Sequence, residues 1–230
     1  MTRVLDILGS LFAIVLLSPL LVVTAIALKF TGEHDVFYRQ TRVGRGGRDF
    51  GILKFATMLR NSANMHGGML TLKDDPRVLP LGKFLRKTKI NELPQLFNIL
   101  VGEMSFVGPR PQARSHYELY SADVRAAIDA MRPGLTGIGS LVFRDEEDML
   151  SDIESRGGML GLDRAGFHDR VIAPYKGELE KWYAAHRTLG TYFALIALTA
   201  WAVVRPRTSA HRKLFKDLPP VPDALKGYLG

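Results

Sequence analysis

The sequence feature that most constrains the fold is an apolar run from Ile7 to Leu28 that contains no charged residue. As one helix it would extend about 33 Å, enough to cross the hydrocarbon core of a bilayer. No small-x-small cleavage site is followed by an exported sequence, so a secretory signal peptide is disfavoured. Basic residues follow the run, whereas only Arg3 precedes it. This asymmetry predicts that the following domain is cytoplasmic.

The middle of this run contains Ser18 and Pro19. Proline lacks a backbone N–H and clashes with the carbonyl four residues earlier, so a bend is expected there. The residues alone favour a kinked single span. The alternative is a re-entrant hairpin that enters and leaves by the cytoplasmic face, in which Ser18 satisfies freed backbone groups.

Composition limits the class of protein. The chain has 230 residues, 47% hydrophobic and 23% charged, so it can bury a core and is not expected to be disordered. It has no cysteine, which excludes disulfides and thiolate metal sites. The formal net charge of +8 suits an anionic membrane or a phosphorylated substrate. We expect no nucleic-acid partner, because the basic residues lack the interleaved aromatics of a single-strand binder.

A basic, glycine-punctuated segment between Phe37 and Phe55 predicts a small β-hairpin. The expected fold class is therefore mainly α with a small β-hairpin element (α+β). Lys54 lies in an apolar strand at the end of this segment. Because a buried ammonium needs an anionic partner, Lys54 is a candidate site residue.

A second candidate group surrounds Glu92. Pro94 suits the first turn of a helix, which predicts Asn91 as its cap and Glu92 near the positive end of its dipole. Such a capped, acidic first turn is also common without any function. Arg86 lies about one to two helical turns before Glu92 and is a further candidate.

The third group is Pro109-Arg110-Pro111. Two prolines restrict the backbone on either side of a guanidinium, which can bind two phosphate oxygens at once. A rigid arginine close in sequence to a carboxylate at a dipole end suggests phosphoryl chemistry.

With these motifs in order, the chain resembles the monotopic phosphoglycosyl transferases. These bacterial sugar transferases load a sugar phosphate onto polyprenyl phosphate. The similarity covers about the first 200 residues. The matching elements are Arg3-x-x-Asp6, Ser18-Pro19, Tyr38-Arg39-Gln40-x-Arg42-x-Gly44, Lys54-Phe55-x-Thr57-Met58, Asp75-Pro76-Arg77, Gly82-x-x-Leu85-Arg86, Glu92-Leu93-Pro94-Gln95-Leu96, Gly102-x-Met104-Ser105-x-Val107-Gly108-Pro109-Arg110-Pro111 and Arg132-Pro133-Gly134-x-Thr136-Gly137.

The resemblance implies a membrane placement and a reaction. Ser18-Pro19 would be the break of a re-entrant helix-break-helix over residues 1–30, followed by a catalytic domain with interfacial helices over 31–204 and a tail over 205–230. The family uses an Asp-Glu pair: the Asp attacks the β-phosphate of a UDP-sugar and expels UMP, and undecaprenyl phosphate then accepts the phosphosugar. Mg²⁺ screens the diphosphate.

The resemblance also implies which residues and partners take part. The substrate- and phosphate-binding candidates are Lys54, Arg77, Arg86, Pro109, Arg110 and Pro111. The expected location is the cytoplasmic face of the bacterial inner membrane, in contact with its lipids. Initiation of exopolysaccharide or O-antigen assembly, downstream glycosyltransferases and a homodimer are compatible with it.

The chain departs from the family at the position expected to attack, which is Asn91. A carboxamide is a poor nucleophile and a weaker Mg²⁺ ligand than a carboxylate. Three explanations are open: Glu92 is the nucleophile, the protein is a catalytically impaired binding or scaffold module, or Asn91 is an engineered change. Ala56 also replaces a family arginine, which favours a divergent branch. We assign the chemistry to Glu92, with Asn91 and Glu92 as candidate metal ligands.

The carboxy-terminal third gives structural expectations. Residues 117–131 predict one amphipathic helix, and Leu189 to Val204 predicts an interfacial or buried helix. The charge run from Arg144 to Asp148 is typical of a solvated face. The basic, proline-rich tail from Arg205 predicts an extended or disordered end. The six histidines are scattered without metal-ligand spacing.

Overall fold

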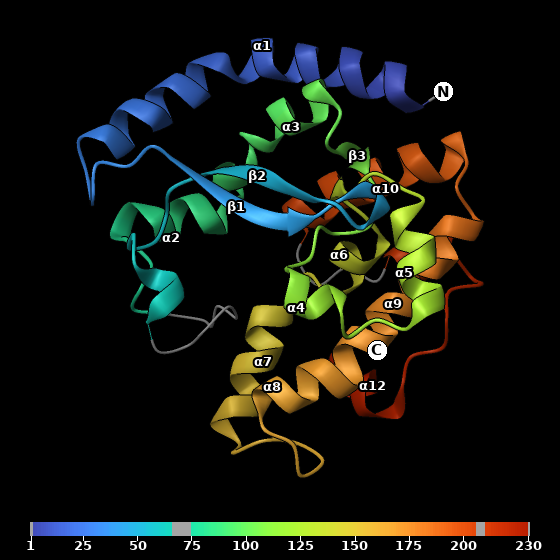
Figure 1. Cartoon of the computed structure of the whole chain (residues 1–230). Helices are drawn as coiled ribbons and strands as arrows, with labels where there is room; N and C mark the ends of the chain where they lie inside the picture. The colour runs from blue at the N-terminus through green and yellow to red at the C-terminus, as the bar shows by residue number, and fades with distance from the viewer. Residues whose placement is uncertain (1, 66–74, 206–209, 230) are drawn as a thin grey trace. The chain divides into compact units, whose positions relative to one another are not determined.

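The computed structural model describes residues 2–65, 75–205 and 210–229. It divides into two compact units, Met1–Thr41 with Phe50–Met104, and Arg42–Asp49 with Ser105–Gly230. The described residues are mostly helical with two small two-stranded sheets (Figure 1). The expected α+β class is confirmed at this level.

The first unit contains the apolar amino-terminal helix and the elements that follow it. They are α1 (Thr2–Lys29), most of β1 (Phe37–Val43) and of β2 (Asp49–Phe55), η2 (Ser62–Asn64), α2 (Pro80–Lys87), η3 (Ile90–Glu92) and α3 (Gln95–Val101). Strands β1 and β2 pair with each other, which confirms the expected hairpin. The turn between them is η1 (Arg45–Gly47), where Gly46 and Gly47 have φ of 70° and 68°, a region that glycine enters without steric cost.

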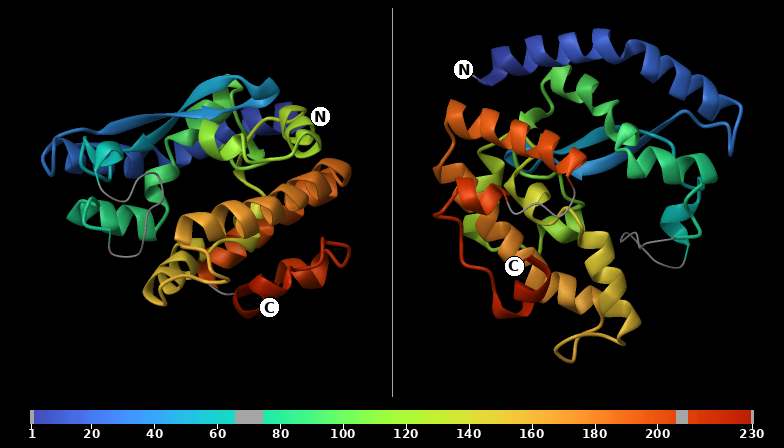
Figure 2. Two further views of the ribbon diagram at one scale, coloured as in Figure 1. Left: turned by 60° about the horizontal axis from the view of Figure 1, so that its bottom comes forward. Right: turned by 180° about the vertical axis from the view of Figure 1, so that it is seen from behind.

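Helix α1 is one continuous, curved helix (Figures 1 and 2). The expected helix-break-helix is therefore not seen as two separate helices. Pro19 leaves the carbonyl of Val15 without its helical donor, and the Ser18 hydroxyl donates to that carbonyl at 2.8 Å. This side-chain bond satisfies the freed carbonyl, the role that the re-entrant alternative gave to Ser18, and it does so within a continuous helix.

Helix α1 is long and apolar enough to cross a membrane by length and composition. Its buried residues are Asp6, Ser10, Thr24 and Leu28, a stripe spaced by multiples of a helical turn. The large apolar side chains on the rest of the helix, such as Phe12 and Val15, are exposed. The helix thus buries a largely polar stripe and exposes an apolar surface.

The core of the first unit lies under the second half of α1. Leu28, Phe55 and Leu85 are 3%, 2% and 2% exposed and form one cluster, against which Ile90 packs. Helix α2 comes close to the end of β2 because residue 82 is glycine. A Cβ there would lie 2.2 Å from the carbonyl oxygen of Thr57.

The second unit contains a short parallel sheet surrounded by helices. Its elements after η1 are β3 (Ser105–Val107), α4 (Arg114–Tyr117), α5 (Ala122–Asp129), β4 (Gly134–Thr136), α6 (Ile138–Val142), α7 (Glu146–Ser155), α8 (Arg164–Phe167), the π-helix η4 (His168–Ile172), α9 (Ala173–Ala185), α10 (Leu189–Val204), α11 (Ala210–Leu214), η5 (Asp223–Leu225) and α12 (Lys226–Leu229). In β3–β4, Ser105 pairs with Gly134 and Val107 with Thr136.

Two expectations for this unit are wrong in detail. Residues 117–131 form parts of two helices, because α4 ends at Tyr117 and α5 begins at Ala122 after the cap residue Ser121. The described part of the tail, residues 210–229, is folded, whereas residues 206–209 lie outside the described residues. Leu225 is fully buried, and the Tyr228 hydroxyl donates to Asp152 at 2.7 Å. The buried Leu225 side chain and the Tyr228 hydrogen bond hold this segment in a folded conformation, whereas its composition alone predicted an extended one.

Candidate functional site

Asn91 and Glu92 lie in η3, a single turn that precedes α3. The expected helix cap is wrong, since α3 begins at Gln95 after Pro94, and Asn91 makes no cap. Lys89 adopts a left-handed backbone conformation with φ of 59°, and the Glu92 amide donates to its carbonyl at 3.1 Å. The chain therefore closes a separate turn before the helix, and this strained turn presents Asn91 and Glu92.

The side chain of Asn91 is buried, with the residue 6% exposed. Its Oδ1 has no hydrogen-bond partner within the part of the chain that the structure describes. An unmet buried acceptor costs about 1–3 kcal/mol, so such an atom points to a donor or cation beyond the described residues. The neighbouring Ile90 packs on the Leu28–Phe55–Leu85 cluster, which fixes the turn to the core.

The first unit brings several of the predicted motifs together. Met58 and Val78 form an isolated β-bridge, the Leu59 amide donates to the Arg77 carbonyl at 2.9 Å, and the Leu79 amide donates to the Thr57 carbonyl at 3.0 Å. The motifs around Lys54 and Arg77, more than twenty residues apart, are thus joined through their backbones. Arg86 reaches the same place from α2, with Nη1 3.9 Å from the Met58 sulfur.

Arg77 is occupied by protein groups. It is 3% exposed, its Nε lies 2.9 Å and its Nη2 2.6 Å from the two Asp75 oxygens, and its Nη1 donates to the Ser62 carbonyl at 3.0 Å. The hydrogen bond to Asp75 raises the pKa of Arg77, with the Coulombic attraction of that carboxylate added to it. A buried pair of this kind is costly to break. We therefore assign Arg77 to the framework of the site rather than to direct phosphate contact.

Lys54 is half-buried on β2, and its Nζ lies 3.4 Å from the Gln40 Oε1 of β1. Sequence reasoning did not single out Asn98, which links α3 to this strand. Its Oδ1 accepts from the Leu53 amide at 2.9 Å, and its Nδ2 donates to the Gly51 carbonyl at 2.9 Å. An asparagine on the apolar side of α3 was the only sequence signal of this link.

The Pro109-Arg110-Pro111 segment belongs to the second unit and leaves the parallel ladder through Gly108. The Gly108 amide donates to the Thr136 carbonyl and the Gly134 amide to the Pro109 carbonyl, each at 2.9 Å. A Cβ at Gly108 would lie 2.3 Å from the Arg132 carbonyl oxygen. The motifs 102–111 and 132–137 are therefore two sides of one closely packed backbone ladder, from which the exposed side chain of Arg110 projects.

Buried charges behind Arg110 were missed by sequence reasoning. Lys176 Nζ lies 2.6 Å from both oxygens of Glu146, so Glu146 is part of a largely buried pair and not of a solvated face. Burial lowers the pKa of Lys176, and Glu146 opposes this only in part. Lys176 and Glu180 are one helical turn apart on α9, among buried apolar residues, and that pattern could have revealed them.

Glu180 supports the Arg110 segment from within. It is 4% exposed and accepts a hydrogen bond from the Arg110 backbone N–H. Burial raises its pKa to about 8, although the Arg110 N–H and Lys176 act in the opposite direction. Its Oε2 has no hydrogen-bond partner among the described residues, so no donor there stabilises a negative charge on that oxygen.

The fold and these groups define the class of protein: a mainly helical protein of two compact units, with an apolar amino-terminal helix and the arginine and carboxylate motifs described above. The family model for the bacterial sugar transferases matches residues 1–206. The chain therefore belongs to the bacterial sugar transferase family.

Curated relatives agree with this assignment. The UDP-N-acetylgalactosamine-undecaprenyl-phosphate N-acetylgalactosaminephosphotransferase of Aeromonas hydrophila is 41% identical over 157 residues, 66% of this chain and 37% of that protein. The UDP-glucose:undecaprenyl-phosphate glucose-1-phosphate transferase of Klebsiella pneumoniae is 40% identical over 67% of this chain and 34% of that protein. The exopolysaccharide production protein ExoY of Sinorhizobium fredii is 37% identical over 63% of this chain and 70% of that protein. The chain thus spans about a third of the length of the first two relatives.

Proposed function

We propose that this protein transfers a sugar 1-phosphate from a UDP-sugar to undecaprenyl phosphate and releases UMP. The observation that carries the proposal is the family match over residues 1–206, which includes both the Asn91-Glu92 turn and the Arg110 segment. The names of the relatives supply the donor and acceptor classes. The product would start the assembly of a surface polysaccharide, with later glycosyltransferases acting on it.

We place α1 on the cytoplasmic side of the inner membrane as a re-entrant or in-plane element. Near its start, Arg3 donates to the carbonyls of Ile99 at 2.5 Å and Leu100 at 2.7 Å; near its end, Leu28 packs on Phe55. Both ends therefore contact the same folded unit. A helix that crossed the bilayer would put these contacts on opposite faces, about 30 Å apart. The exposed apolar surface between them suits insertion into one leaflet.

The reaction begins with Glu92. A carboxylate oxygen of Glu92 forms a bond to the β-phosphorus of the UDP-sugar while the bond from that phosphorus to the bridging oxygen breaks, and UMP leaves with the electron pair. A phosphate oxygen of undecaprenyl phosphate then attacks the same phosphorus and displaces the carboxylate. The products are undecaprenyl-diphospho-sugar and the original Glu92 carboxylate, so the two steps balance.

The other residues bind and orient. In the first unit, Lys54 and Arg86 are the proposed cationic ligands of the diphosphate. In the second unit, Arg110 is a proposed phosphate ligand whose backbone Pro109 and Pro111 restrict. Asn91 Oδ1, buried and without a hydrogen-bond partner among the described residues, and the carboxylate of the next residue, Glu92, are oxygen donors of the kind that Mg²⁺ accepts. When bound by Asn91 and Glu92, Mg²⁺ would neutralise charge on the diphosphate.

One observation favours a second candidate function. Because the family's attacking position is Asn91 in this chain, the protein would bind a UDP-sugar or a lipid phosphate without turning it over if Glu92 does not act. It would then be a membrane-associated binding module, which acts through a partner enzyme.

The test is UMP release by purified protein in detergent with undecaprenyl phosphate, Mg²⁺ and a panel of UDP-glucose, UDP-galactose and UDP-N-acetylgalactosamine. We expect release with at least one donor, and a loss on the order of 10³-fold or more in Glu92→Gln. Glu118→Gln, an exposed carboxylate of the second unit, is the control and should keep full activity.

Two results decide between the candidates. Full activity in Glu92→Gln would sink the assignment of the nucleophile. Binding of a UDP-sugar without release from any donor, followed by release in Asn91→Asp, would identify the natural chain as a binding module.

A further inference from the structure

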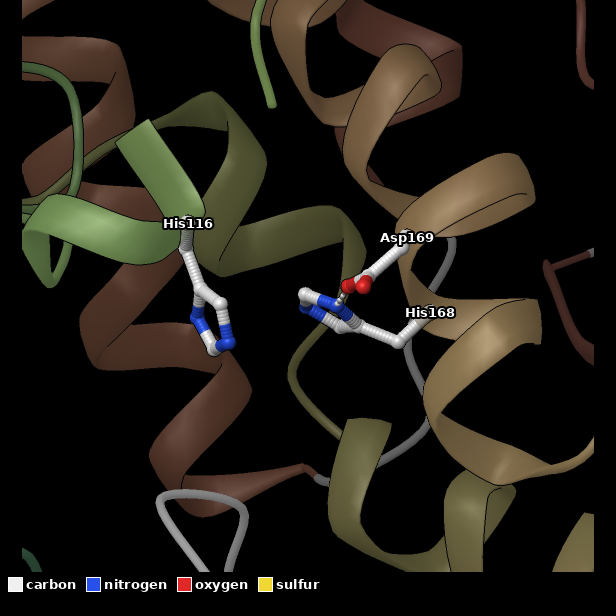
Figure 3. Close-up of side chains that lie close together, drawn as sticks. All are labelled: His116, His168 and Asp169. Atoms are coloured by element: carbon white, nitrogen blue, oxygen red, sulfur yellow. Dashed lines mark hydrogen bonds and ion pairs between the residues drawn. The ribbon is translucent and has the colours of Figure 1, made fainter. Parts of the chain in front are cut away.

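We propose that the second unit contains a transition-metal site, of the kind that binds Zn²⁺, formed by His116, His168 and Asp169. Each residue offers one ligand atom, and these atoms all lie within 4.8 Å of one another. Figure 3 shows the two imidazole rings close together and tilted relative to each other, with the Asp169 carboxylate beside His168. This site lies outside the proposed phosphosugar chemistry and does not depend on it.

The three ligands come from two elements that are far apart in the sequence. His116 lies on α4, and His168 and Asp169 begin the π-helix η4. The ring centroids of the two histidines are 4.7 Å apart, and His168 is 4% exposed. A π-helical turn is rare and often occurs at functional sites, because it redirects side chains that a regular helix would carry elsewhere. The sequence shows no metal spacing here because only the fold brings the histidines together.

The distances between the candidate ligand atoms would suit a bound ion after small rotations of their side chains. Tetrahedral Zn²⁺ with ligands at about 2.0–2.2 Å holds its ligand atoms roughly 3.3 Å apart. The His168 Nδ1 and Asp169 Oδ1 are closer than this, at 2.7 Å, whereas the widest separation in the group is within 4.8 Å. Rotation of the half-buried His116 and Asp169 side chains around the buried His168 ring would open the first contact and shorten the others toward the required spacing. Water would complete the coordination.

The donor set selects the metal. Two imidazole nitrogens and one carboxylate oxygen suit Zn²⁺ and other late divalent ions, whereas Mg²⁺ prefers a set of oxygens only. Two cations, Arg42 and Lys176, lie close enough to act on His116, and Glu146 holds Lys176 with both oxygens. Glu146 Oε1 also lies 3.8 Å from His168 Nε2, so a second carboxylate stands behind the site.

A bound ion would cross-link α4 to η4 through its protein ligands. Helix α4 begins at Arg114, shortly after the Pro109-Arg110-Pro111 segment in the same unit. The ion would therefore add metal–ligand bonds to the hydrogen bonds that hold the segment after Arg110 in place. The predicted effect is a stabilised second unit, since an ion that binds only the folded chain shifts the unfolding equilibrium.

The test uses the full chain, purified without a histidine tag and stripped with chelator. We expect it to take up about one Zn²⁺ per chain, to show a higher melting temperature with Zn²⁺, and to give the intense visible bands of tetrahedral Co²⁺ when loaded with that ion. His116→Gln and Asp169→Asn should each weaken Zn²⁺ binding by about tenfold or more. Mg²⁺ should produce none of these effects.

The chain offers a matched control in His186. Its Nε2 lies 2.9 Å from Asp217 Oδ2, and among the described residues this histidine–aspartate pair belongs to no group of three possible ligands. His186→Gln should leave Zn²⁺ uptake unchanged. Each variant is compared with wild type for its apo melting temperature, and Asp169→Asn carries the test if His116→Gln is unfolded. Uptake that is equal in wild type and in both site variants, or Co²⁺ bands of octahedral intensity only, would overturn the site.

Discussion

At the scale of single residues, the fold places charges where their chemistry differs from that of the free amino acids. Glu180 holds the Arg110 backbone from a buried position, and burial raises its pKa to about 8. Arg77 makes its hydrogen bonds to Asp75, so we assign this motif arginine to the framework of the site. Asn91 retains a buried acceptor without a described partner. All three roles depend on burial, which a motif does not specify.

Glu180 predicts a pH dependence of stability. Between its ordinary value of 4.5 and about 8, the folded state keeps a proton that the unfolded state releases. The free energy of unfolding therefore falls as the pH rises through this interval, and the contribution is fully present only below it. We expect Glu180→Gln to become more stable relative to wild type as the pH rises from about 5 to about 9, by a few kcal/mol at most.

The measurement is denaturant or thermal unfolding of both proteins in detergent across this range. Glu178→Gln on the same helix is the control, because Glu178 is exposed and pairs only weakly with Lys181 at 3.3 Å. A stability difference between wild type and Glu180→Gln that stays constant with pH would show that Glu180 titrates normally in the folded state.

At the scale of elements, the sequence predicted the features that depend on local sequence patterns. The uncharged run gave α1, the glycine-punctuated segment gave the β1–β2 hairpin, and Ser18 beside Pro19 gave the side-chain bond to Val15. Contacts between segments that are distant in the sequence could not be predicted from it. The pairing of Ser105 with Gly134, the Lys176–Glu146 pair and the approach of His116 to His168 all join segments that no periodicity connects.

In two further places the sequence allowed two local conformations and could not decide between them. Asn91 before Pro94 fits a helix cap, but the left-handed Lys89 closes an independent turn first. The tail is similar: its prolines predicted an extended end, whereas Leu225 finds a buried position and the Tyr175 hydroxyl donates to the Pro219 carbonyl at 3.0 Å. In both places tertiary packing decided between local alternatives.

The β3–β4 ladder gives a prediction at this scale. Gly108→Ala would put a Cβ 2.3 Å from the Arg132 carbonyl oxygen and 3.0 Å from the Gly134 nitrogen, both of them backbone atoms that move only with the chain. We expect a loss of about 1–3 kcal/mol in the free energy of unfolding, because overpacking forces backbone shifts. The same shift should reduce UMP release if Arg110 binds the donor.

The matched control is Gly227→Ala, where a Cβ would meet nothing within 4 Å. That residue lies in α12, so alanine should be neutral or slightly stabilising. Denaturant midpoints of the two variants, measured side by side, check the prediction. Equal stability of Gly108→Ala and wild type would mean that the ladder is looser than the backbone distances indicate.

At the scale of the whole molecule, the central issue is which face of the membrane each end of α1 occupies. Length and apolarity alone allow a span. The contacts oppose one: Arg3 binds α3 at the start of the helix, and Leu28 joins the Phe55 cluster at its end. Breaking both contacts to let the helix cross would expose the α3 carbonyls and the apolar cluster, which a single-sided placement avoids.

This argument predicts a labelling pattern. The natural chain has no cysteine, so Thr2→Cys and Thr31→Cys each create one thiol, at the two ends of α1. In inverted inner-membrane vesicles, a membrane-impermeant thiol reagent should label both variants, whereas in intact spheroplasts it should label neither. A spanning helix places the two thiols on opposite faces, because its length of about 42 Å exceeds the hydrocarbon thickness of about 30 Å.

Ser115→Cys, at an exposed position of the second unit, reports the sidedness of the vesicles and any leakage of the reagent. Labelling of Thr2→Cys from the spheroplast side, with Ser115→Cys protected there, would establish a transmembrane α1 and reject the one-sided placement. Protection of both ends there, with labelling of all three variants in inverted vesicles, would put α1 and the second unit on the cytoplasmic face. Under the proposed function the acceptor is a lipid phosphate at the membrane surface, and that outcome would put the Asn91-Glu92 turn, anchored through Ile90 to the cluster packed against α1, on the same side as this acceptor.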